Sequence, residues 1–248
     1  EKLRPRVSGT AIGLWGVYLG MTVVMAVFLM FGPMDWFDSL CHTMSCVSTG
    51  GFSTKNESIG FWDSRYIDSI VIVFMFLGGV NFSLIYNALS GKIRVLWENE
   101  VLRWYVLLCC IGTLICFGDL FYRGENSNVI DCLLDSLFHI VATITTTGFS
   151  VENYSWGQFS MMVLMLLMIS CACAGSTSGG LKIDRMAVML KNVKNEFIKA
   201  LHPNQVTSVR LNGKVVPYSH VQRVIAFLVI FTLILGVSTT VLTLFNIE

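Results

Sequence analysis

The sequence predicts an all-α integral membrane protein built from parallel repeats, each with a spanning helix, a short re-entrant helix and a second spanning helix. This prediction rests on composition, on long uncharged runs and on an internal repeat. Of the 248 residues, 54% are hydrophobic and 13% are charged, and the mean hydropathy is +0.67. Soluble domains carry roughly 25% charged residues, so this chain has too few charges to cover the surface of one.

Five uncharged runs have about the length that a spanning helix needs, which is roughly 20 residues. The third run, residues 104–118, is the shortest, but the flanking side chains of Arg103 and Asp119 can reach toward the membrane surface and lengthen it. The chain begins without a Met and ends directly after the fifth run, so we expect a piece of a longer polypeptide. The runs cover residues 7–34, 69–91, 104–118, 160–181 and 224–247.

The chain also contains an internal repeat, with a shift of 97 residues between the copies. Residues 38–60, DSLCHTMSCVSTGGFSTKNESIG, align without a gap on residues 135–157, DSLFHIVATITTTGFSVENYSWG, and 11 of the 23 positions are identical. The same shift brings Gly78 onto Gly175, so the register continues into the next apolar run. Two copies of one structural unit are therefore expected, and a further unit opens with the last run.

Between the two spanning runs of each unit lies a short segment, residues 36–47 in the first unit and 133–144 in the second. Twelve residues of helix measure roughly 18 Å, which is too short to cross a membrane. We expect re-entrant helices that dip into the membrane and return through the T-x-G-F-S strand. Each unit then crosses twice, so successive units run parallel and can surround a common axis.

The strands after these segments, STGGFS and TTTGFS, are candidate filter strands for an ion. Backbone carbonyls at membrane depth are costly unless water or an ion satisfies them. The strands contain hydroxyls, glycine and one aromatic but no charged side chain, which favours a weakly hydrated monovalent cation bound by carbonyl and hydroxyl oxygens. A tight turn without an ion is the alternative interpretation.

The alignment indicates which glycine matters in each strand. Gly51 aligns with Gly148, whereas Gly50 aligns with Thr147. We therefore expect Gly51 and Gly148 to need a backbone conformation that a Cβ disfavours. The predicted filter residues are Ser48, Thr49, Gly50, Gly51, Phe52, Thr145, Thr146, Thr147, Gly148 and Phe149, with potassium bound through Thr49, Gly50, Gly51, Thr146, Thr147 and Gly148.

Two polar pairs accompany the filter strands in the repeat. Asp38 and Asp135 lie near the starts of the re-entrant segments, where capping or compensation of the helix dipole is expected, with cation attraction secondary. His42 and His139 are expected to be hydrogen-bonded packing residues rather than ligands.

Six small residues interrupt the second spanning run of the later unit. They lie twelve residues after Val163, roughly 18 Å along a helix and so near mid-membrane, and they lower helix propensity there. The earlier unit keeps only its first two glycines, which predicts an intramembrane gating loop in one unit, residues 173–182; close helix packing is the alternative. The predicted gate residues are Gly175, Ser176, Thr177, Ser178, Gly179, Gly180 and Lys182.

After the loop, apolar residues at helical spacing predict a helix on the inner face that ends before Pro203. An Asn-Gly pair between short β-prone runs then predicts a hairpin. Residues 184–219 offer a basic surface to lipid headgroups or to a cytosolic partner.

The charges divide unevenly between the two faces of the membrane. If the filter strands share one face, that face has three basic residues (Lys55, Arg65 and Arg123) and eleven acidic ones, a formal charge of −8. The positive-inside rule then places the filter strands outside and the basic loops in the cytoplasm of a multi-pass protein. An acidic outer mouth would concentrate cations, although the charges could also serve topology alone.

The segments VSTGGFST, ITTTGFS, CAGSTSGGLK and LHPNQVTSVRLNGKVV together resemble the membrane subunit of the Trk/Ktr potassium-uptake superfamily, and the HPN segment favours the Trk branch. The resemblance implies a potassium-channel-like fold in which four such units surround one pore in the plasma (inner) membrane. It also implies potassium as the transported ligand, a homodimer and control by a cytosolic nucleotide-binding ring, with no further cofactor, no nucleic acid and no enzymatic activity.

Under this resemblance, residues 1–100 form the second pore unit and residues 101–200 the third, whose loop at 175–180 matches the family's gating loop. Residues 201–220 form a cytosolic connection with a hairpin, and residues 221–248 the first helix of a further unit. The first and fourth filter strands lie outside the chain. Either the rest of a longer polypeptide, which we favour, or a second copy of the chain would complete the pore.

Other functions stay open at this point. A sodium-coupled or sodium-conducting transporter would share the same features. A membrane enzyme with Cys173 or Ser176 as nucleophile lacks a nearby general base. The eight cysteines lie mostly in apolar stretches, which is typical of packing residues rather than of disulfides.

Overall fold

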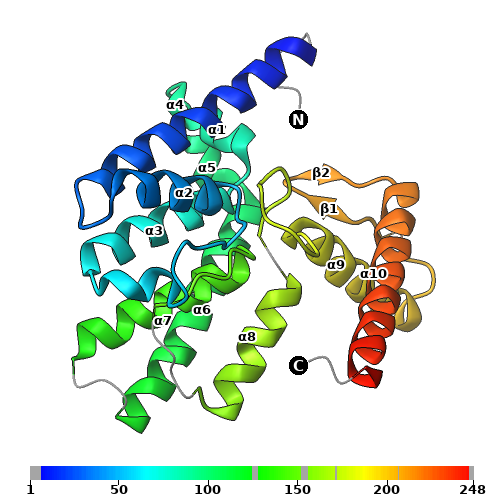
Figure 1. The fold of residues 1–248 in the computed structure, drawn as a ribbon. Coiled ribbons are helices and arrows are strands. Elements are labelled where there is room, and N and C mark those ends of the chain that lie inside the picture. The colour runs from blue at the N-terminus through cyan, green and yellow to red at the C-terminus, as the bar shows by residue number, and fades with distance from the viewer. Residues whose placement is uncertain (1–6, 125–127, 152–155, 171, 206, 246–248) are drawn as a thin grey trace. The chain divides into compact units, whose positions relative to one another are not determined.

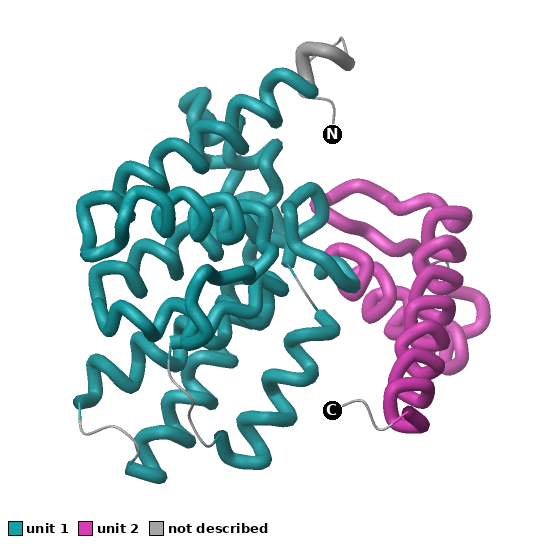
Figure 2. The backbone as a smooth tube through the Cα atoms, in the orientation of Figure 1, with its two compact units in different colours: residues 1–183 teal, residues 184–248 magenta. Residues whose placement is uncertain are grey.

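The computed structural model describes residues 7–124, 128–151, 156–170, 172–205 and 207–245. The chain forms two compact units, residues 1–183 and 184–248, which are shown in different colours in Figure 2.

The first repeat occupies the first half of the larger unit (Figure 1). A long helix, α1 (Val7–Met30), is followed by the short helix α2 (Trp36–Val47) and, after the first filter strand, by the 3₁₀ turn η1 (Ser58–Trp62). Helix α3 (Arg65–Gly78) packs against α1 and α2. The bounds of α2 coincide with the predicted re-entrant segment, and its length of 12 residues is too short for a span.

The second repeat has the same order of elements. It comprises the long helix α6 (Glu100–Arg123), the re-entrant helix α7 (Val129–Ile144) and α8 (Gln158–Ser170). Helices α6 and α7 lie side by side, as Figure 1 shows. Helix α7 begins four residues before the predicted start at 133, because the apolar periodicity already starts at Val129.

The predicted continuous span over residues 69–91 is wrong. The chain instead forms α3 and α4 (Phe82–Leu89), which are bent by 105° at a short break. The break follows Gly78 and Gly79, and the Asn81 side chain accepts a hydrogen bond of 2.7 Å from the Ser83 backbone nitrogen, which caps a new helix. A short helix, α5 (Arg94–Glu98), then leads into α6. In both repeats, therefore, the second apolar run is interrupted and does not form one continuous helix.

A buried apolar core of the larger unit is formed by the first repeat together with α7 of the second. Side chains from α1, α2, α3 and α7 form one buried apolar cluster, which includes Met25, Val47, Ile67, Met75 and Phe138. Among the described residues, three helices are long and apolar enough to span a membrane, within 11–30, 100–123 and 218–244, and the bent α3–α4 pair would make a fourth. Packing of α3 on α7 joins the first repeat to the second.

The smaller unit holds the predicted inner helix and hairpin. It consists of most of α9 (Ile183–Leu201), the strands β1 (Arg210–Leu211) and β2 (Lys214–Val215), and α10 (Tyr218–Leu244). The hairpin turn has positive φ at Asn212 (49°) and Gly213 (75°), as a type I′ turn requires. The hairpin is therefore confirmed.

Candidate ion filter and intramembrane loop

The two filter strands have the same backbone conformation at equivalent positions. Thr49 and Thr146 have φ values of 55° and 57°, and Gly51 and Gly148 have φ values of 71° and 78°. Left-handed backbone therefore recurs at alternate residues in both strands, and the expectation that Gly51 and Gly148 need glycine's freedom is confirmed. Left-handed threonine was not predicted; such strained conformations concentrate at functional sites and ligand clamps.

Identical hydrogen bonds attach each strand to its re-entrant helix. Ser48 and Thr145 are the C-caps of α2 and α7. The Gly50 backbone nitrogen donates to the Ser45 carbonyl at 2.7 Å, and the Thr147 nitrogen donates to the equivalent Ala142 carbonyl at 3.0 Å. The carboxyl ends of both short helices therefore lie at the starts of the strands, with their partial negative charges at the same place.

The two strands touch at Gly51. A Cβ built on this residue would lie 1.7 Å from the Thr147 carbonyl oxygen, a distance that no side chain can occupy. A Cβ on Gly50, in contrast, would meet its nearest neighbours at 3.4 Å, which is ordinary contact. At position 51, both the backbone conformation and the neighbouring atoms thus require glycine. At position 50, neither of them does.

A second contact joins the segments that follow the filter strands. The backbone nitrogens of Ile59 and Gly60 both donate to the Ser150 carbonyl, at 3.1 and 3.2 Å. A Cβ on Gly60 would lie 1.8 Å from the Val151 carbonyl oxygen. The strands of the two repeats are therefore direct neighbours, as parallel units around one axis require.

The aromatic residues of the two strands differ in their surroundings. Phe149 is 2% exposed and its ring lies 5.9 Å from that of His42, whereas Phe52 is 82% exposed. The two copies of the strand are therefore more alike in backbone conformation than in the packing of their side chains.

Both histidines hold their helices through hydrogen bonds and ring contacts. His42 Nδ1 lies 2.8 Å from the Asp38 carbonyl, and Nε2 lies 2.9 Å from Ser53 Oγ. His139 Nδ1 lies 2.9 Å from the Asp135 carbonyl, and its ring lies 5.2 Å from that of Trp156. These contacts are those of packing residues, as expected.

The expectation of capping is wrong for Asp38 and Asp135, because the N-cap positions are Asp35 and Asn128. Compensation of the helix dipole, the other expected role, fits Asp38, which lies in the first turn of α2. Asp38 accepts a hydrogen bond from Thr54 Oγ1 at 2.7 Å, and Lys55 Nζ lies 3.4 Å from its other oxygen. Its charge is thus paired within its own repeat.

Asp135 is paired differently, because the positions equivalent to Thr54 and Lys55 are Val151 and Glu152. The fully buried Asp135 carboxylate instead accepts hydrogen bonds from the guanidinium of Arg65, at the start of α3 in the preceding repeat. Arg65 Nε also lies 3.1 Å from Asp131. The role of Arg65 was not predicted, because no local spacing relates it to residues 70 positions away.

The predicted gating region is an irregular loop: among the described residues 172–182 there is no helix. Positive φ values at Gly175 (77°) and Gly180 (64°) allow the chain to reverse. The loop is fixed to the α3–α4 break, where the Cys173 nitrogen donates to the Gly79 carbonyl at 3.0 Å and Asn81 Nδ2 donates to the Ala174 carbonyl at 2.6 Å. Asn81 was missed, although an amide inside an apolar run is a signal of such a contact.

The same loop contacts the filter. Thr177 Oγ1 lies 2.9 Å from the Val47 carbonyl at the end of α2 and 3.2 Å from the Gly78 carbonyl. The Gly179 nitrogen donates to Thr146 Oγ1 at 2.9 Å. The loop therefore lies directly against both re-entrant elements.

Lys182 brings a positive charge to the loop. Its Nζ donates to the Ser178 carbonyl and lies 3.3 Å from the hydroxyl oxygens of Ser176 and Ser178. The ammonium group thus ties the carboxyl end of the loop to its middle, at Ser176 and Ser178.

Two copies of a re-entrant helix followed by an uncharged strand with alternating left-handed residues define a membrane protein of the potassium-channel-like fold. The chain belongs to the TrkH family, because the family model described as "Cation transport protein" matches residues 1–247. The resemblance to Trk proteins is thereby confirmed.

Known proteins support this assignment. The chain is 32% identical over 240 residues to the Trk system potassium uptake protein TrkH of Escherichia coli K12, an overlap of 96% of this chain and 50% of that protein. It is 31% identical to TrkG of the same organism, over 94% of this chain and 48% of that one. The crystal structure of the potassium transporter TrkH from Vibrio parahaemolyticus matches with a TM-score of 0.88 and 29% identity, over 94% of this chain and 51% of that one. The chain spans about half the length of the curated relatives that it matches.

Proposed function

We propose that the chain supplies two neighbouring filter strands of a potassium-uptake pathway. The observation that carries this proposal is the contact at Gly51 between two strands with the same unusual backbone. The similar proteins are named potassium uptake proteins, and nothing in the strands favours sodium.

In the proposed mechanism, potassium loses its hydration shell to backbone carbonyls and threonine hydroxyls of the two strands. Thr49, Gly50 and Gly51 act from one repeat, and Thr146, Thr147 and Gly148 from the other. No charged side chain is needed, because the carboxyl ends of α2 and α7 supply partial negative charge. Further strands, from the rest of a longer polypeptide, would complete the ring.

The loop 173–182 is proposed as the gate. It contacts both α2 and Thr146, so a movement of the loop would change the space beside the filter strands. Lys182 and the two serines it contacts would hold the closed arrangement, and breaking these contacts would release it.

The proposed orientation places the filter strands outside and the basic loops in the cytoplasm of the plasma (inner) membrane. The three basic residues of the outer face, Lys55, Arg65 and Arg123, are all engaged with acidic neighbours. The exposed acids Asp35, Glu57 and Asp63 then give the mouth its excess negative charge, which would attract cations.

Homodimer formation and control by a cytosolic nucleotide-binding subunit are proposed on the resemblance alone. The basic residues of 184–219, on α9 and the hairpin, are the surface proposed to face such a subunit or the lipid headgroups.

Substitution of Gly51 tests the proposed function. In the full-length protein, expressed in cells that lack other potassium-uptake systems, Gly51→Ala should abolish rubidium uptake, because its Cβ would overlap the Thr147 carbonyl. Gly50→Ala is the matched control and should retain uptake, since the equivalent residue in the other repeat is already Thr147. Normal rubidium uptake by Gly51→Ala at wild-type expression would refute the proposal.

A further inference from the structure

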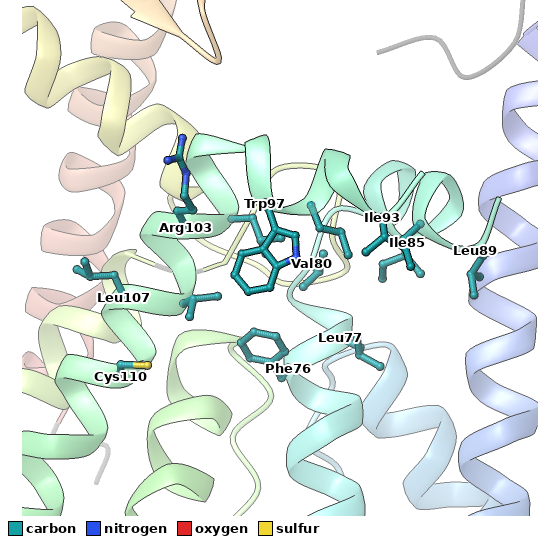
Figure 3. Close-up of a pocket in the computed structure, with 14 residues that line it drawn as sticks. Phe76, Leu77, Val80, Ile85, Leu89, Ile93, Trp97, Arg103, Leu107 and Cys110 are labelled. Atoms are coloured by element: carbon teal, nitrogen blue, oxygen red, sulfur yellow. The ribbon is translucent and has the colours of Figure 1, made fainter. Parts of the chain in front are cut away.

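A large apolar pocket lies at the bend between α3 and α4. Its volume is about 800 Å³, and its walls come from the end of α3, from α4 and α5, and from the first turns of α6 (Figure 3). Phe76 and Val80 form its floor, and Leu89, Ile93 and Trp97 remain 60–77% exposed around it. The 105° bend creates the pocket, because it turns α4 and α5 away from the axis of α3.

The rim of this pocket combines an aromatic and a basic side chain. In Figure 3 the Trp97 ring lies over Phe76, and the guanidinium of Arg103 points away from the apolar floor. Arg103 also borders a smaller neighbouring pocket of about 310 Å³, together with Glu100 and Trp104. Tryptophan concentrates at the boundary between membrane and water, and arginine extends its charge toward that boundary. This combination is typical of a site at the level of lipid headgroups.

We propose that the pocket binds an anionic phospholipid, with an acyl chain along Phe76, Val80 and Trp97 and the phosphate at Arg103. An acyl chain suits the apolar lining, and a phosphate suits an exposed guanidinium at its rim. The cytoplasmic leaflet supplies this lipid in the orientation proposed above, since its anionic lipids attract basic segments. A free phosphate would leave the apolar walls exposed.

A lipid here would also act on the intramembrane loop. Phe76 stacks on Tyr105, with ring centroids 4.8 Å apart, and Tyr105 donates a hydrogen bond of 3.2 Å to the Phe76 carbonyl. Gly79, in the break, accepts the hydrogen bond from Cys173 that anchors the loop. Filling the pocket would therefore stabilise the bent form of the α3–α4 pair and the loop position that depends on it. The choice of the cytoplasmic leaflet rests on the proposed orientation, and any effect of the lipid on transport rests on the proposed role of the loop as a gate.

Quenching of tryptophan fluorescence by brominated lipids tests the binding. The full-length protein is placed in nanodiscs of either brominated phosphatidylglycerol or brominated phosphatidylcholine, and the difference between wild type and Trp97→Phe isolates the signal of Trp97. Quenching should be stronger with the anionic lipid. Arg103→Gln should remove this preference, and Ala88→Phe, which fills the pocket, should reduce quenching by both lipids. Arg94→Gln is the matched control, because Arg94 is exposed and pairs with Glu98 outside the pocket lining.

Two results would overturn the proposal. Equal quenching by both lipids, unchanged in Arg103→Gln, would indicate ordinary lipid contact at the protein surface. Absence of any Trp97-dependent quenching would indicate that protein fills the pocket. Neither result bears on potassium transport, since rubidium uptake of the same variants is measured separately. Lost lipid preference with normal uptake would therefore affect the lipid proposal alone.

Discussion

At the scale of single residues, the two candidate filter strands resemble one another in backbone conformation more than in side-chain identity. In the repeat, Thr49 is equivalent to Thr146 and Gly51 to Gly148, and all four residues have left-handed backbone. The glycines could be recognised from the sequence, because one of two adjacent glycines is shared between the copies. The threonines could not, since a left-handed conformation at a β-branched residue is imposed by the surrounding structure and not by its own preference.

The ion pair between Arg65 and Asp135 allows a prediction at the same scale. Arg65→Gln should destabilise the protein by about 2–3 kcal/mol, because the fully buried Asp135 carboxylate loses charged hydrogen bonds. The double variant Arg65→Gln, Asp135→Asn should recover much of this loss, since the buried charge is then removed as well. Thermal unfolding of the purified protein in detergent measures both effects.

The control for this pair is Arg94→Gln, which breaks an exposed pair with Glu98 and should change stability by less than about 1 kcal/mol. Equal destabilisation by Arg65→Gln and Arg94→Gln would show that the ion pair between the repeats contributes no more to stability than an exposed pair does.

At the scale of elements, sequence reasoning succeeded where local signals are strong. The bounds of α2, the end of α9 before Pro203 and the Asn-Gly hairpin all follow from length, apolar spacing and turn chemistry. It failed at the α3–α4 bend, because Gly78, Gly79 and Asn81 mark an interruption of the apolar run but not the direction that the chain takes after it. The bend depends on Asn81, whose side chain caps α4 and also contacts Ala174, more than 90 positions away.

The loop 173–182 gives the prediction for this scale. Thr177→Val should weaken the closed loop, because it removes the hydroxyl that contacts the Val47 and Gly78 carbonyls. Rubidium flux into proteoliposomes in the absence of any regulatory subunit should rise severalfold. Thr22→Val is the control, since its hydroxyl bonds only within α1 in the described structure. Unchanged or lower flux in well-folded Thr177→Val would contradict the assignment of this loop as the gate.

At the scale of the whole molecule, the two repeats form one body through contacts that neither repeat could make alone. The filter strands touch at Gly51, Gly60 fits against Val151, and Arg65 of one repeat neutralises Asp135 of the next. The repeat could be read from the sequence, and with it the parallel arrangement of the units. The pairing of the repeats could not, because equivalent residues such as Gly51 and Gly148 make different contacts in the two copies, and Arg65 has no basic counterpart.

The central claim is that residues 48–52 and 145–149 are adjacent strands around one cation pathway. Anomalous scattering from crystals of the full-length protein grown with thallium or rubidium tests it most directly. We expect anomalous peaks within coordinating distance of oxygen atoms of Thr49, Gly50 and Gly51 and of the equivalent Thr146, Thr147 and Gly148. Well-ordered filter strands without a peak beside them, or peaks only elsewhere in the protein, would contradict the account.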